Sequence, residues 1–150
     1  MAVASPTLDL KGLKHAAEST PALWPYVQRF EMIRNAIGEH CSDAVVWAAA
    51  YGSFIDLVGS GQSKRSRRRE KVLVVTTLSS LYDAIELLAD NVFADVLITT
   101  GHLTDYRVWT LAEYRAVSSS NRELMREVLE SGVTLYGEPP GNSAHTDRAV

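Results

Sequence analysis

Cysteine is almost absent from this sequence, since Cys41 is the only one among 150 residues. A single cysteine excludes an internal disulfide and a zinc site built from several cysteines. The four histidines are scattered without the spacing of metal ligands, which disfavours a histidine site as well. No apolar run approaches the roughly 18 residues of a membrane-spanning helix, and the first residues lack the pattern of a secretory signal. We therefore expect a cytoplasmic protein without membrane contacts.

Charge is modest in total, with a net value of −3, but it is unevenly distributed. Six of the 15 basic residues lie between Lys64 and Lys71, where Glu70 is the only acid, so this segment carries +5 and the remainder −8. An acidic body with one basic loop is not typical of a general nucleic-acid-binding protein. The basic loop suits contact with a phosphate-rich ligand or an acidic partner, and we expect residues 59–69 to be mobile without one.

Length and composition fit one globular domain, with 46% hydrophobic and 22% charged residues. We expect residues 20–138 to form it, residues 1–19 to be a flexible tail or a short marginal helix, and residues 139–150 to be disordered. Apolar patterns predict, in order, a helix over 20–38, strands over 44–51 and 72–76, a helix from Ser80, a strand over 92–99, a short strand over 107–109 and helices over 110–131. This order indicates an α/β or α+β fold with a small mixed sheet.

Local signals refine these predictions. Capping-box patterns mark two helix starts, at Ser80 and at Thr110. The helix from Ser80 has an apolar stripe that we expect to face the core, made of Leu81, Ile85 and Leu88. Three aromatic residues lie close together on the first long helix, where core packing is the default and an exposed partner face the alternative: Trp24, Tyr26 and Phe30.

Four segments occur in an order that resembles the minimal nucleotidyltransferase family, which has a polymerase-beta-type palm fold. In that family a strand ends in Gly-Ser, the next strand carries two carboxylates one residue apart, a third strand supplies another aspartate, and the chain ends in a Gly-Val-x-Leu-Tyr-Gly exit. The matching segments here are Ala48 to Ser53, Glu70 to Val75, Ala94 to Ile98 and Glu130 to Gly137. The resemblance covers about residues 26–138. It implies helices mainly on one face of the sheet, and it requires residues 93–99 to share a sheet with residues 72–76.

The family pattern serves nucleotidyl transfer, in which two divalent cations neutralise the triphosphate and activate the attacking hydroxyl. Carboxylates at positions i and i+2 of a strand point to one face, and such oxygen ligands suit Mg²⁺. The Gly-Ser turn brings backbone N–H groups and a hydroxyl to the phosphates. The resemblance therefore implies a catalytic metal site at Glu70 and Asp95, with a nucleoside triphosphate held by Gly52, Ser53, Lys64 and Arg65.

The chain departs from this pattern at its centre. Glu70 stands at the first carboxylate position, and Val72, which cannot bind a cation, stands at the second. Asp95 alone is retained in type, and a buried aspartate in an apolar strand must be paired or bind a cation. Glu70 lies among arginines, so its ordinary interpretation is a surface ion pair with one of them. Two alternatives stay open: Gly59-Ser60 as the true Gly-Ser pair, and Asp56 as a substitute ligand.

Our hypothesis is a catalytically degenerate nucleotidyltransferase-like protein that acts by binding a nucleotide, a partner protein or both. The resemblance implies the antitoxin-like half of a toxin–antitoxin pair, with a helical HEPN-type partner; a homo-oligomer is also open. One alternative is an active enzyme that uses Mg²⁺ to move a nucleoside monophosphate from a nucleoside triphosphate to a protein or small molecule. The other is a plain protein-interaction module. On the degenerate hypothesis, Val72→Asp, alone or with Glu70→Asp, should recover transfer.

Overall fold

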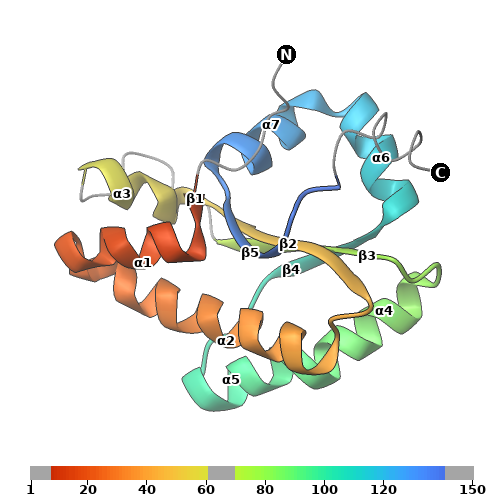
Figure 1. Cartoon of the computed structure of the whole chain (residues 1–150), viewed down its shortest axis with the longest axis horizontal. Coiled ribbons are helices and arrows are strands. Elements are labelled where there is room, and N and C mark those ends of the chain that lie inside the picture. Colours follow the sequence, from red (N-terminus) through yellow and green to blue (C-terminus); the bar gives the residue numbers. More distant parts are fainter. Residues whose placement is uncertain (1–7, 61–69, 141–150) are drawn as a thin grey trace.

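The structure is a computed structural model that describes residues 8–60 and 70–140, and its centre is a five-stranded mixed sheet (Figure 1). The strands follow the order β1-β5-β2-β3-β4. The β2 strand is antiparallel to both β3 and β5, whereas the pairs β1–β5 and β3–β4 are parallel. The strands are β1 (Leu8–Asp9), β2 (Val45–Tyr51), β3 (Lys71–Thr76), β4 (Tyr106–Thr110) and β5 (Val133–Gly137). The mixed α/β class expected from the sequence is confirmed.

The helices cover both faces of this sheet, as Figure 1 shows. One face carries α1 (Leu10–Ser19), α2 (Trp24–His40), α4 (Leu81–Leu88) and α5 (Ala94–Thr100), and the other carries α6 (Leu111–Ser120) and α7 (Arg122–Ser131). Short helical turns are η1 (Pro21–Leu23), η2 (Ser53–Ile55) and α3 (Asp56–Ser60), and the π-helical turn η3 (Ala89–Phe93) joins α4 to α5. Most of the helices therefore lie on one face, as expected, but the second face is covered as well.

Two buried clusters explain why both faces are covered. Alternate residues of a strand point to opposite faces, and β3 is apolar at every position after Lys71 until Thr76. Val72 and Val74 pack with the apolar residues of α1, α2 and α5, whereas Leu73 and Val75 pack with those of α6 and α7. A strand that is apolar on both sides needs a helical layer on each, so the chain forms three layers.

The first described residues are part of the fold and not a flexible tail. Asp9 accepts a hydrogen bond from the backbone N–H of Gly12 at 2.8 Å, which caps the start of α1. Leu10, Leu13 and Ala17 then lie on one helical face and are buried. Of the termini, residues 1–7 and 141–150 lie outside the described residues, as do residues 61–69 of the expected mobile loop.

The segment 92–99, expected to be a strand, is helical. The helix that starts after Ser80 runs through α4, η3 and α5 and ends at Gly101, whose φ of 75° provides a left-handed C-cap. No glycine or proline interrupts it before Gly101, and a short apolar run does not by itself distinguish a strand from a buried helix. The strand beside β3 is β4, which the sequence predicted only as a short strand over 107–109.

Candidate functional site

Three strands bring the candidate residues together at one end of the sheet. The end of β2 lies beside the start of β3, with Tyr51 opposite Lys71, and the start of β4 lies on the other side of β3. Gly52 follows β2 with a φ of 146°, a conformation that favours glycine, and so turns the chain away from the sheet. Glu70 and Lys71 are consecutive, and the alternation of the strand sends their side chains to opposite faces.

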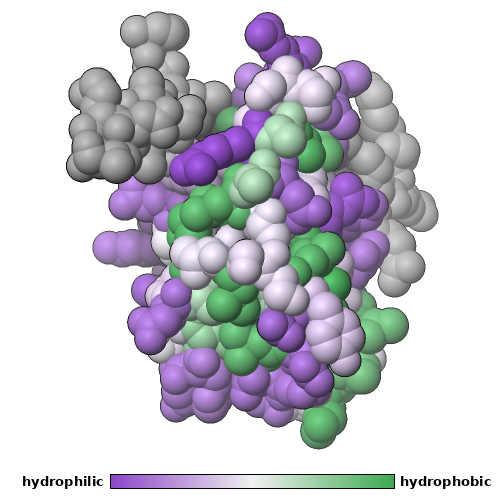
Figure 2. All heavy atoms as spheres, turned by 90° about the vertical axis from the view of Figure 1, so that its right-hand side faces the viewer, coloured by the Kyte–Doolittle hydropathy of each residue, from purple (hydrophilic) through white to green (hydrophobic). Residues whose placement is uncertain are grey.

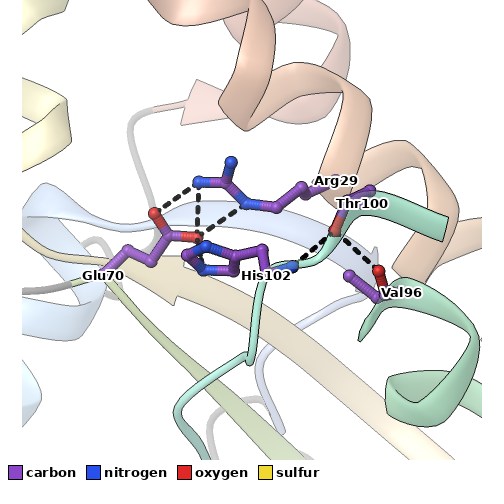
Figure 3. Close-up of polar contacts among 5 residues, drawn as sticks. All are labelled: Arg29, Glu70, Val96, Thr100 and His102. Atoms are coloured by element: carbon purple, nitrogen blue, oxygen red, sulfur yellow. Dashed lines mark hydrogen bonds and ion pairs between the residues drawn. The ribbon is translucent and has the colours of Figure 1, made fainter. Parts of the chain in front are cut away.

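On the face of α2, the carboxylate of Glu70 is held by an arginine (Figure 3). The guanidinium of Arg29 donates to Glu70 through Nη2 at 2.7 and 2.9 Å and through Nε at 3.2 Å. His102 Nε2 lies 3.4 Å from Glu70 Oε2 on the other side. The side chains of Arg29 and Glu70 are only 13% and 9% exposed, so this pair is largely shielded from water. Such a bidentate, charge-assisted pair fixes both groups.

Both partners of Glu70 are held in place by their own neighbours. The guanidinium of Arg29 lies 5.0 Å from the ring centre of Tyr26, which stacks on Phe54 at 5.1 Å. This contact connects α2 with the turn η2 that follows Gly52. His102 follows the C-cap of α5, and its backbone N–H donates to Thr100 Oγ1 at 3.1 Å. The cluster therefore joins α2, β3 and the end of α5.

On the opposite face, Lys71 lines an open cavity of about 490 Å³. The remaining lining residues come from β2, β4 and α7 and from the turns beside them: Tyr51, Gly52, Asp105, Arg107, Leu124 and Glu127. Neither Lys71 nor Arg107 has an ion-pair partner among the residues that the structure describes. The cavity thus combines two cations and two carboxylates with the apolar surfaces of Tyr51 and Leu124.

The electrostatics of this cavity act on the phenol of Tyr51. Burial raises the pKa of Tyr51 above its ordinary value of 10.0. The guanidinium of Arg107 opposes this rise, and the carboxylates of Glu127 and Asp105 add to it. Tyr51 is therefore a neutral hydrogen-bonding group at neutral pH.

The predicted metal site is not assembled as expected. Asp95 lies in the first turn of α5, where it is exposed, and not on a strand beside β3. Val72 is fully buried in the core, and Glu70 is committed to Arg29. Among the described residues, no three acidic, histidine or cysteine side chains form a group that could hold a metal ion. The side chains at these positions do not fit Mg²⁺, because a cation at Glu70 would have to displace the guanidinium.

The predicted nucleotide-binding residues have different outcomes. Gly52 lies beside the start of β3, as the resemblance implies, and the backbone of Ser53 opens η2. Lys64 and Arg65 lie outside the described residues, as does the side chain of Ser53. Of the alternatives, Asp56 is the first residue of α3, and Gly59-Ser60 ends that helix and does not follow a strand.

Sequence reasoning missed the residues that complete both sides of the site. Arg29 and Glu70 are 41 positions apart, and no local pattern connects them. Arg107 lies within a predicted strand, and its place beside Lys71 depends on the parallel pairing of β3 with β4. Glu70 does form an ion pair, but the surface pair with a neighbouring arginine that the sequence suggested is wrong: the pair is largely buried, and its arginine comes from α2 and not from the basic loop.

The comparisons with known proteins give no relative. No family model, no curated protein and no solved structure matches the chain. Among the described residues, none of the helices has the length and apolarity needed to cross a bilayer. The resemblance also fails the condition that it requires, because residues 93–99 are helical and do not lie in the sheet of β3. Function is therefore best argued from the geometry at the end of the sheet.

Proposed function

We propose that this protein is a nucleotide-binding α/β domain that does not carry out metal-dependent nucleotidyl transfer. One observation carries the proposal. Arg29 neutralises the carboxylate of Glu70 on one face of the sheet, whereas Lys71 and Arg107 line an open cavity on the other face. Protein cations at the cavity would neutralise phosphate charge without a bound metal ion.

The lining of the cavity suits each part of a nucleotide. Lys71 and Arg107 can donate to phosphate oxygens, and the carboxylates of Asp105 and Glu127 can accept hydrogen bonds from ribose hydroxyls. The apolar part of the lining, from Leu124 and the edge of the largely buried Tyr51, can contact the base. A volume of about 490 Å³ lies within the range of small-molecule sites, roughly 300–1,000 Å³.

The test is calorimetric titration of the whole protein with ATP in the presence of EDTA. We expect binding without Mg²⁺, weaker binding of adenosine, and at least about tenfold weaker binding of ATP by the Lys71→Ala/Arg107→Ala variant. A matched control is Lys11→Ala/Arg34→Ala, which removes two cations from a separate cavity of about 780 Å³ beside α1 and α2. Loss of binding in the control and not in the first variant would contradict the proposed site.

An active nucleotidyltransferase is the competing proposal, and the same protein tests it. Transfer of labelled nucleotide to an acceptor, dependent on Mg²⁺ and abolished by Asp95→Asn, would overturn the binding-only proposal. The placement of Asp95 on α5 and of Val72 in the core favours the absence of such transfer. Pairing with a HEPN-type protein and assembly into a homo-oligomer stay predictions of the resemblance.

A further inference from the structure

The exposed apolar residues of this protein are concentrated in one segment. In the part of the chain that the structure describes, all six exposed large hydrophobic residues lie between positions 81 and 103: Leu81, Tyr82, Ile85, Leu97, Ile98 and Leu103. Tyr82 and Ile98 are the most exposed, at 73% and 80%. Single exposed apolar residues are ordinary, but their confinement to one segment marks an interaction surface.

The segment forms one long ridge. The helical elements α4, η3 and α5 are continuous from Leu81 to Thr100, and the exposed side of this helix is the ridge. At 1.5 Å per residue its length is about 30 Å. The inner side of this helix is buried through Ala84, Leu88 and Val96, so the exposed residues lie on the side that no other described element covers. Figure 2 views the right-hand side of Figure 1, where α6 and α4 lie, and apolar residues reach the surface there between hydrophilic ones.

The charge of the ridge has a single sign. Residues 72–106 contain no lysine or arginine. The helix from Leu81 to Thr100 carries four carboxylates, all on exposed residues: Asp83, Glu86, Asp90 and Asp95. This charge disfavours three classes of occupant, because a second copy of the same ridge, an anionic membrane and a nucleic acid would all bring negative charge against it.

We propose that this ridge docks an amphipathic helix of a partner protein, in which lysine or arginine residues flank an apolar stripe. Apolar residues at spacings of three and four, such as Leu81 with Ile85 and Tyr82 with Ile85, match the ridges that pack between two helices. The partner's cations meet the four carboxylates, which steer association and fix its orientation. This surface is separate from the cavity at Lys71, so it does not depend on the proposed nucleotide binding.

The experiment uses the whole protein and a defined probe. The probe is an amphipathic helical peptide of leucine and lysine, and the control peptide has glutamate at every lysine position. Binding is measured by fluorescence anisotropy. We expect the cationic peptide to bind and the anionic peptide not to bind, and we expect Tyr82→Ser/Ile98→Ser to weaken binding by at least about tenfold. Both residues are exposed, so the variant should keep the fold, which circular dichroism checks.

A charge variant separates the acidic contribution from the apolar one. Glu86→Gln/Asp90→Asn should weaken binding at low salt by about threefold and have little effect at high salt. The matched control is Glu18→Gln/Glu39→Gln, which removes two exposed carboxylates from α1 and α2 and should change nothing. Equal binding of both peptides, or the same effect from both charge variants, would overturn the proposal. A dimer of the free protein that Tyr82→Ser/Ile98→Ser dissociates would assign the ridge to a second copy and also overturn it.

Discussion

Glu70 and Lys71 are neighbours in the chain, but the two faces of the sheet give them opposite surroundings. Glu70 is enclosed by Arg29 and His102, and its charge is neutralised within the protein. Lys71 opens onto a cavity and has no ion-pair partner among the described residues. The difference arises because successive side chains of a strand point to opposite faces of the sheet, and here one face is closed by α2 and the other is open. Substitutions on the Glu70 side should change stability, whereas those on the Lys71 side should change binding.

The largest effect is expected from Val72→Asp, which the sequence alone suggested as a way to recover catalysis. Val72 is fully buried among apolar residues of the α2 face, so its carboxylate would have no partner and no water. We expect the free energy of unfolding to fall by at least about 4 kcal/mol, measured by urea denaturation. Val72→Thr, with nearly the same shape and no charge, should lose less. A folded Val72→Asp protein that transfers nucleotide would show that the Glu70 side can be a catalytic site.

The next largest effect is expected from Arg29→Met. This change leaves the carboxylate of Glu70 largely buried without its cation, which typically costs about 3–5 kcal/mol. Combining it with Glu70→Met removes both charges and should recover most of that loss in urea denaturation. Additive losses in the double variant would mean that the ion pair is not the reason for the effect, and that the two side chains act through separate contacts.

The fold could be predicted from the sequence wherever a local signal was strong. The capping box at Thr110 is present with both hydrogen bonds, because Thr110 and Glu113 each bond to the other's backbone. Strands β2 and β3 lie where their apolar runs predicted them. The helix α1 was underestimated, although Asp9 and the spacing of its apolar residues are signals that the sequence contains.

The rest depended on contacts that a local pattern does not contain. The run around Asp95 is apolar enough for a strand, but it continues a helix, and only its position in the fold decides between the two. The apolar stripe expected at Leu81, Ile85 and Leu88 is also partly wrong. Leu88 faces the core together with Ala84, whereas Leu81 and Ile85 are exposed. The aromatic residues of α2 pack against the core, as the default interpretation predicts. The exposed apolar surface lies on α4 and α5 and not on α2.

Lys71→Ala tests the open side of the comparison. Because Lys71 makes no ion pair with another described residue, we expect the free energy of unfolding to change by no more than about 0.5 kcal/mol. The affinity for ATP should fall about tenfold, which corresponds to about 1.4 kcal/mol and to the loss of one charge-assisted hydrogen bond. Calorimetry and urea denaturation on the same sample check both values. A large loss of stability with unchanged affinity would reverse the roles assigned to the two faces.

The smallest effect concerns pH and Tyr51, which lines the open cavity. Burial raises the pKa of Tyr51 in the folded state above its ordinary value of 10.0, so the folded protein holds this proton more tightly than the unfolded chain. The stabilisation is therefore fully present below pH 10.0 and is lost as the pH rises through the folded-state pKa. Tyr51→Phe should reduce the alkaline loss of stability, measured by urea denaturation at neutral pH and above pH 10.0.

The same pKa tests the position of Arg107. Because the guanidinium lowers the pKa of Tyr51, Arg107→Gln should raise this pKa further and steepen the alkaline loss of stability. The ultraviolet absorbance of the phenolate can follow the titration, with Tyr51→Phe as the reference. An unchanged titration in Arg107→Gln would show that the guanidinium does not face the phenol, and would remove Arg107 from the group of residues expected to meet a phosphate.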